Sequence, residues 1–187
     1  MSWPEIIATA LGVAGVGLMI RRNLWAFPIG LAQVSIFGWV CFAQKLYSET
    51  ALQVMFFAAL VHGWWHWTHA GSDRKELPVQ RLSAGARWAW VLTALVLWAV
   101  WGWLMRRAGA ALAWGDAFVF AVSVCAQWLQ ARKCIENWPG WLAANTAAIG
   151  VFIAKELHLF AGLYTLFWAM ALWGWREWRE AMRGRQA

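Results

Sequence analysis

Charged residues are scarce in this chain of 187 residues, at 13% of the sequence, whereas soluble domains carry about a quarter. No G-x-S-x-G, H-E-x-x-H or phosphate-loop motif occurs. The three cysteines, Cys41, Cys125 and Cys134, form no C-x-x-C pair and have no metal-ligand spacing. No basic stretch opens the chain as in a cleavable signal peptide. These absences argue against an enzyme and a disulfide scaffold, and we expect no metal and no cofactor.

Apolar residues are abundant instead. Hydrophobic residues make up 62% of the chain, and 19 residues are tryptophan, which favours the membrane–water interface. A helix of about 20 apolar residues spans a bilayer, so the composition predicts an all-α membrane protein. Seven candidate spans lie at about residues 4–20, 25–43, 50–67, 88–105, 115–131, 138–154 and 159–178.

An internal repeat relates the two ends of the chain, because residue n matches residue n + 111 without a gap. Matched pairs are Trp3 and Trp114, Glu5 and Asp116, Arg21-Arg22 and Arg132-Lys133, Pro28 and Pro139, Leu46 and Leu157, and Phe56 and Phe167. Both copies end in a G-W-x-x-W motif, starting at Gly63 and Gly174. We interpret these motifs as interfacial anchors whose glycines allow close helix packing.

Each repeat contains three spans, and the span at 88–105 has no partner. Because three is an odd number, two directly joined repeats would lie inverted in the membrane. The extra linker span gives the second repeat the same orientation as the first, as in a class of transporters. The expected organisation is a first three-helix repeat (1–70), a loop and linker helix (71–110), a second repeat (111–181) and a basic tail (182–187).

The net charge of +7 is better explained by the positive-inside rule than by nucleic-acid binding, because the basic residues lie between apolar runs. Twelve of the 16 Lys and Arg residues fall on one side of this topology and four on the other. We therefore expect the N-terminus outside the cell and the C-terminus in the cytoplasm. The minority side holds Lys45, Arg106, Arg107 and Lys155.

No acidic residue lies in the middle of a span, which argues against a proton- or sodium-coupled pump and against a charged channel filter. The uncharged polar candidates inside the spans are Gln33, Gln53, Gln127, Asn145, Thr146 and Tyr164. Any one of them is explained equally well as a contact between helices. As a set they suit an uncharged or delocalised-charge ligand that carries hydroxyl groups. His62 and His66 have helical i, i+4 spacing, but no third metal ligand is evident.

One helix face combines two indoles with an amide. Trp138, Trp141 and Asn145 lie at i, i+3 and i+7. Such a face can stack a flat ring and hydrogen-bond its substituents, and a cationic ring gains a cation–π attraction. The alternative is that the indoles are interfacial anchors, which suits Trp138 better than Trp141.

The run Ala131-Arg-Lys-Cys-Ile-Glu-Asn-Trp-Pro-Gly-Trp-Leu-Ala-Ala-Asn145 resembles a signature of the PnuC vitamin transporters. The run from Leu46 through Gln53 to Trp67 resembles the first repeat of the same family. The resemblance implies a SWEET-like fold and facilitated diffusion of a vitamin precursor, in most members nicotinamide riboside, across the bacterial inner membrane. The same resemblance implies that a cytoplasmic kinase then phosphorylates and so traps the imported precursor, and it suggests a homo-oligomer. The resemblance also implies five substrate contacts: Trp138, Trp141, Asn145, Gln53 and Gln127.

Other functions remain open at this point. Relatives in the same superfamily carry thiamine or riboflavin, and nicotinamide riboside and thiamine both contain cationic rings, so the aromatic face does not separate them. A scaffold subunit without cargo is a third hypothesis, although it does not need a polar face inside the sixth span.

Overall fold

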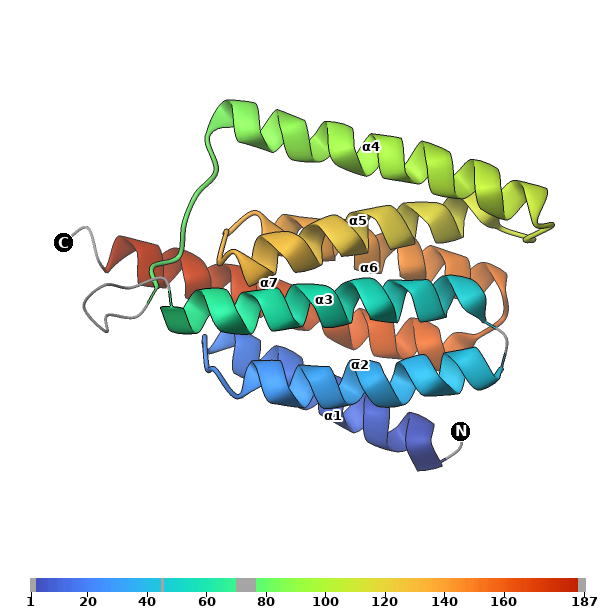
Figure 1. Ribbon diagram of the computed structural model, residues 1–187, viewed down its shortest axis with the longest axis horizontal. Helices are drawn as coiled ribbons and strands as arrows, with labels where there is room; N and C mark the ends of the chain where they lie inside the picture. Colours follow the sequence, from blue (N-terminus) through green and yellow to red (C-terminus); the bar gives the residue numbers. More distant parts are fainter. Residues whose placement is uncertain (1–2, 45, 70–76, 185–187) are drawn as a thin grey trace.

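The computed structural model describes residues 3–44, 46–69 and 77–184, and these residues form seven helices (Figure 1). The helices are α1 (Trp3–Ile20), α2 (Ala26–Ala43), α3 (Tyr47–His69), α4 (Ala84–Arg107), α5 (Ala113–Ala131), α6 (Asn137–Ala154) and α7 (His158–Arg183). Each predicted span coincides with one helix, and the prediction of an all-α fold is confirmed. The ends of the helices differ from the predicted spans by a few residues.

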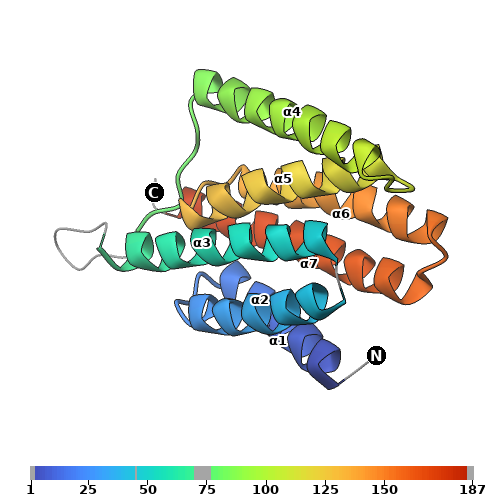
Figure 2. The ribbon, with the colours of Figure 1, turned by 45° about the vertical axis from the view of Figure 1, so that its right-hand side comes forward.

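Six of the described helices form a closed ring. Going round it, α1 packs on α2, α2 on α3, α3 on α5, α5 on α6, α6 on α7, and α7 returns to α1. The linker helix α4 packs mainly on α5, with one hydrogen bond from Trp101 to Ser48 of α3 (3.1 Å), and lies outside the ring, as both views of the ribbon show (Figures 1 and 2). The ring therefore has an interior to which both repeats contribute three helices.

The two ends of the ring differ in charge. We call one end the basic end; there lie the last turns of α3 and α7 and the start of α4 (Figure 1). The described basic residues at this end are Arg21, Arg22, Arg81, Arg87, Arg132, Lys133, Arg176, Arg179 and Arg183, against Arg106, Arg107 and Lys155 at the opposite end. Lys45, Arg74, Lys75 and Arg185, which the sequence count also used, lie outside the described residues.

The repeat extends to individual contacts. The indole nitrogen of Trp67 donates to the backbone oxygen of Ala131 (2.9 Å), and Trp178 donates to that of Ile20 (3.2 Å). Adding 111 to Trp67 gives Trp178, and Ala131 lies 111 residues after Ile20. The predicted architecture of three, one and three helices is thus confirmed at the level of matched hydrogen bonds.

Four aromatic side chains close the ring at the basic end: Phe27, Trp67, Trp138 and Trp178, which we call the tryptophan plug. Phe27 meets Trp67 edge-on with ring centroids 5.1 Å apart, and Trp138 meets Trp178 in the same way at 5.4 Å. Trp67 and Trp178 touch across the two repeats at 6.0 Å. The main hydrophobic core of the described residues is built around this plug. Because edge-to-face pairs add to the burial of large rings, this end is tightly packed.

The glycines of the G-W-x-x-W motifs make room for the plug. A Cβ atom on Gly174 would lie 2.3 Å from the ring of Trp138, and one on Gly63 would lie 2.8 Å from Phe27. The predicted close approach at both glycines is therefore present, and each one seats an aromatic ring of its own repeat.

Among the described helices, α1, α2 and α4 are long and apolar enough to cross a membrane by length and composition alone. The other four are at least as long as α1, with 18 to 26 residues. They fall short in hydropathy because they carry glutamine, asparagine, histidine and charged residues. Three of them, α3, α5 and α6, contain the buried amides described below.

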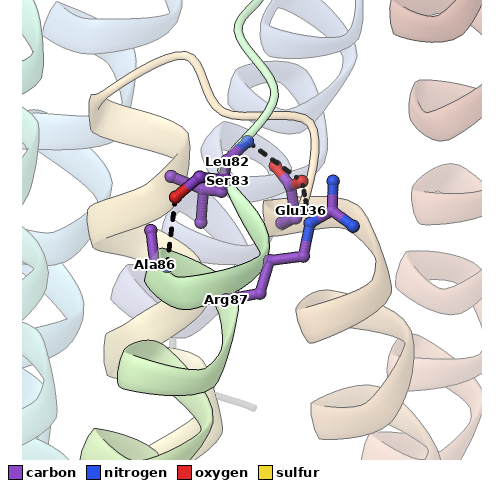
Figure 3. A network of polar contacts seen from close by, with 5 residues as sticks. All are labelled: Leu82, Ser83, Ala86, Arg87 and Glu136. Carbon is purple, nitrogen blue, oxygen red and sulfur yellow. Dashed lines mark hydrogen bonds and ion pairs between the residues drawn. The ribbon is translucent and has the colours of Figure 1, made fainter.

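The linker helix begins at a polar junction with the second repeat (Figure 3). Glu136 Oε1 accepts hydrogen bonds from the backbone nitrogen of Leu82 (3.1 Å) and from Arg87 Nε (3.0 Å). Ser83 caps the helix by accepting from the nitrogen of Ala86 (3.3 Å). An isolated parallel β-bridge between Gln80 and Cys134 fastens the same junction. The start of α4 is therefore fixed to the turn between α5 and α6.

Candidate substrate site in the ring interior

A contact across the ring forms the floor of the interior. Phe56 of α3 meets Trp141 of α6 edge-on at 5.8 Å, although these two helices are not neighbours in the ring. The indole nitrogen of Trp141 also donates to Gln130 Oε1 of α5 at 2.6 Å. Phe56, Gln130 and Trp141, which we call the floor, thus join three helices through one ring contact and one hydrogen bond.

Three carboxamides lie about one helical turn further from the basic end. Gln53 is three residues from Phe56, Gln127 three from Gln130, and Asn145 four from Trp141. At about 1.5 Å of rise per residue, each of the three lies about 5 Å along its own helix from the floor residue of that helix. We call Gln53, Gln127 and Asn145 the amide layer.

The amide layer has unused hydrogen-bonding capacity. None of its side chains is more than 7% exposed, and the described residues include no hydrogen-bond partner for any of the three. Gln53 Oε1 is fully enclosed without a partner. Because a buried polar group without a partner costs about 1–3 kcal/mol, such a layer is suited to receive the polar groups of a ligand.

Trp138 lies apart from the other predicted contacts. It is three residues before Trp141 on α6, only 1% exposed, and forms part of the plug against Gly174 and Trp178. Its indole nitrogen is buried without a hydrogen-bond partner. The structure thus buries Gln53, Gln127 and Asn145, leaves Trp141 partly buried against Phe56 and Gln130, and puts Trp138 one turn below Trp141 on α6.

The sequence interpretation missed Gln130 and Phe56, and comparison of the two repeats would have pointed to Gln130. Interior positions of the second repeat are polar or aromatic where the first repeat is small or apolar. Ser123, Gln127, Gln130, Trp141 and Asn145 match Gly12, Val16, Met19, Gly30 and Val34. Residues that hold the repeats together are matched, whereas residues of the interior layers break the match. Comparison of the repeats does not point to Phe56, because the residue that matches it in the second repeat, Phe167, is also phenylalanine.

Charged groups flank the interior without entering the two layers. At the opposite end, Lys155 Nζ contacts both carboxylate oxygens of Asp116 (2.8 and 2.9 Å). The matched pair in the first repeat is a hydrogen bond from the uncharged amide of Gln44 to Glu5 (3.2 Å). At the basic end, Lys133 Nζ lies 4.2 Å from the ring centre of Trp67. The floor and the amide layer are uncharged between these ends.

His62 and His66 do not belong to this interior. They stack on each other at 5.9 Å, and His62 lies against Trp128 at 5.3 Å. His62 also lines a surface groove with the apolar side chains Phe57, Val61 and Trp65. The described residues contain no group of three side chains able to hold a metal ion.

Comparisons with known proteins agree on one family. The family model described as nicotinamide mononucleotide transporter matches residues 2–180. The nicotinamide riboside transporter PnuC of Escherichia coli is 26% identical, over 99% of this chain and 88% of that protein. The riboflavin/roseoflavin transporter RibM of Streptomyces davaonensis is also 26% identical, over 94% and 84%.

A solved structure has the same fold. The crystal structure of the vitamin B3 transporter PnuC matches with a TM-score of 0.80 at 20% identity, covering 97% of this chain and 83% of that chain. The four helices that are too polar to be recognised as spans alone therefore have counterparts in a known transporter.

Proposed function

This chain belongs to the nicotinamide mononucleotide transporter family, and from that premise we propose that it carries nicotinamide riboside into the cytoplasm by facilitated diffusion. Family membership makes it a membrane transporter and not an enzyme. The observation that carries the proposal is the stack of an uncharged amide layer on the floor formed by Phe56, Gln130 and Trp141. The amides suit ribose hydroxyls and the carboxamide, and the indole suits the cationic pyridinium ring.

The interior favours the riboside over its phosphate. A phosphate group carries about two negative charges near neutral pH and needs a cation or several N–H donors in a buried site. The lysines nearest the interior are engaged, Lys155 with Asp116 and Lys133 on the ring of Trp67. A cytoplasmic kinase that phosphorylates the riboside would therefore trap it, because the product fits the interior poorly.

The proposed roles follow from position. Trp141 stacks the ring, and Gln53, Gln127 and Asn145 bind the polar groups around it. Trp138 contributes from below, where its unpartnered indole nitrogen is one turn from Trp141. The excess of basic residues supports a cytoplasmic basic end in the bacterial inner membrane, with the N-terminus outside.

Calorimetric titration of the purified protein tests the proposal. Nicotinamide riboside should bind with a Kd in the micromolar range or below, and nicotinamide mononucleotide should not bind. Trp141→Ala and Asn145→Ala should each weaken binding tenfold or more, which is about 1.4 kcal/mol. Thr146→Ala is the matched control, because Thr146 follows Asn145 but is exposed and accepts from Trp168 at 3.1 Å.

Riboflavin is the second candidate cargo, because a riboflavin transporter is as similar to this chain as the riboside transporter. Its ribityl hydroxyls also match the amide layer, but its ring is larger and neutral. Tight riboflavin binding without riboside binding would reassign the cargo and keep the site. If neither ligand binds, and thiamine does not bind either, the proposed substrate site is contradicted.

A further inference from the structure

The G-W-x-x-W motifs do more than pack against aromatic rings. In each motif the second tryptophan is buried and its indole nitrogen reaches into the other repeat. Trp67 of α3 donates to Ala131 at the end of α5, and Trp178 of α7 donates to Met19 (3.3 Å) and Ile20 (3.2 Å) at the end of α1. The two boundaries between repeats, α3 with α5 and α1 with α7, thus carry one such bond each.

Both ends of these bonds need a partner. The last carbonyl groups of a helix receive no hydrogen bond from within that helix, and Ala131 and Ile20 are the last residues of α5 and α1. The oxygen of Met19 already accepts from the backbone nitrogen of Arg22 (3.0 Å). Trp67 and Trp178 are 8% and 0% exposed, so their N–H groups are shielded from solvent. Each bond satisfies a buried donor and a helix-end acceptor at once, and both groups need water when it breaks.

The polar bonds described at the opposite end are arranged differently. Gln44 donates to Glu5 within the first repeat, and Lys155 to Asp116 within the second. Separating the repeats at that end leaves both of these bonds intact, and the described polar contact that it would break there is the hydrogen bond from Trp101 of the linker helix to Ser48 of α3 (3.1 Å). Separating them at the basic end breaks the bonds of Trp67 and Trp178.

We propose that Trp67 and Trp178 are paired latches that hold the ring shut at the basic end, and that both open when cargo leaves on that side. The inference rests on the proposed transport function and adds the element that gates it. Because the latches are related by the repeat, they open as the two repeats separate and the tryptophan plug comes apart. Lys133, whose ammonium lies over the ring of Trp67, reinforces one of them.

Accessibility of the plug tests the latches. Ala171, 2% exposed, packs in the core around the plug. In a background of Cys41→Ala, Cys125→Ala and Cys134→Ala, Ala171→Cys reports on this core through its reaction with a water-soluble maleimide in nanodiscs. Trp67→Phe and Trp178→Phe keep an aromatic ring and remove the indole donor together with part of the ring. Each should raise the labelling rate about fivefold, the equivalent of one buried hydrogen bond, and the double variant should raise it further.

Matched controls are present on the same helices. Trp64, three residues before Trp67, is exposed, and Trp173 donates to Glu177 of its own helix (3.1 Å). Trp64→Phe and Trp173→Phe should leave labelling of Ala171→Cys unchanged. Unchanged labelling in both single latch variants, or equal acceleration in the controls, would overturn the proposal; the singles decide it if the double variant does not fold.

Ligand binding is measured separately from maleimide labelling. The latch variants should bind nicotinamide riboside within about threefold of the parent protein, because the latches lie below the floor and the amide layer. Failure of the parent protein to bind the riboside would refute the proposed cargo and leave the labelling result valid. Normal riboside binding with unchanged labelling would refute the latches alone.

Discussion

Gln130 is the residue whose role the structure adds to the site. Its Oε1 accepts the indole proton of Trp141 at 2.6 Å, so it fixes the ring that we propose to stack the substrate. Its side-chain nitrogen has no partner among the described residues. Gln130 therefore positions Trp141 with one end of its carboxamide and presents a donor to the interior with the other.

Gln130→Met should weaken nicotinamide riboside binding about tenfold, because the indole N–H of Trp141 loses its acceptor, a cost of about 1–3 kcal/mol. Gln130→Glu keeps an acceptor oxygen and adds a negative charge near the proposed position of the pyridinium ring. It should bind the cationic riboside at least as well as the parent and riboflavin less well. Calorimetric titration with both ligands measures the ratio of their dissociation constants in each variant. Equal losses for both ligands in both variants would show that Gln130 only supports the fold.

At this scale the sequence predicts the interior amides but not all of their surroundings. Gln53, Gln127 and Asn145 stand out because they are polar in apolar helices. Trp138 and Trp141 look equivalent on a helical wheel, yet Trp138 falls in the plug. Its position depends on Gly174 of another helix, whose lack of a side chain makes room for the ring. Such a contact between helices does not follow from the periodicity of one helix.

Helix α7 offers a controlled test of packing, since it contains Gly162 and Gly174 in the same kind of backbone. Gly174→Ala places a Cβ 2.3 Å from the ring of Trp138, whereas nothing lies within 4 Å of a Cβ on Gly162. Gly174→Ala should destabilise the protein by about 1–3 kcal/mol through overpacking. Gly162→Ala should be neutral or stabilising, because alanine is the better helix former. Thermal unfolding in detergent compares the two, and equal midpoints would contradict the close approach at Gly174.

The junction of α4 with the second repeat predicts a pH-dependent reactivity. Burial raises the pKa of the Cys134 thiol to about 11, and the negative charge of Glu136 adds to the effect. The unreactive thiol form therefore dominates at pH 7 to 9, and the reaction rate with a disulfide reagent should rise about tenfold per pH unit.

Glu136→Ala should accelerate this reaction at pH 8 in a Cys41→Ala, Cys125→Ala background. It removes a charge that adds to the raised pKa and also the acceptor that holds Leu82 and Arg87, so the segment that covers Cys134 is held by the β-bridge without these two bonds. Glu177→Ala, which removes an acidic residue from the partly exposed surface of α7, is the control and should change nothing. A rate in Glu136→Ala equal to that of the parent would show that the junction is not what protects Cys134.

The helices themselves are largely predictable, because long apolar runs interrupted by basic pairs and prolines leave few alternatives. The contacts of the linker are not. The β-bridge between Gln80 and Cys134 joins two short irregular segments that carry no strand pattern. Their pairing is set by the ring of helices, which brings the two segments together after each helix has been placed.

For the whole molecule, the closed ring explains why the repeat is exact at some positions and broken at others. Matched residues such as Trp67 and Trp178 hold the two halves together and must satisfy the same geometry twice. Unmatched residues such as Gln127 and Val16 face a single shared interior, where one ligand needs only one set of contacts. The parallel repeat therefore gives a symmetric framework of helices around an asymmetric site. The solved transporter structure has the same framework.

The uncharged interior predicts how transport is driven. Coupling to protons or sodium needs a titratable or ion-binding group that both sides of the membrane reach in turn, and the floor and the amide layer contain none. In liposomes, labelled nicotinamide riboside should therefore equilibrate to equal concentrations at the same rate with or without a pH or sodium gradient. Accumulation above equality should appear only when a riboside kinase and ATP are enclosed, because phosphorylation then removes the free riboside. Accumulation driven by an ion gradient alone would contradict facilitated diffusion and require a charged site outside the two layers, for which the Asp116–Lys155 pair would be the first place to look.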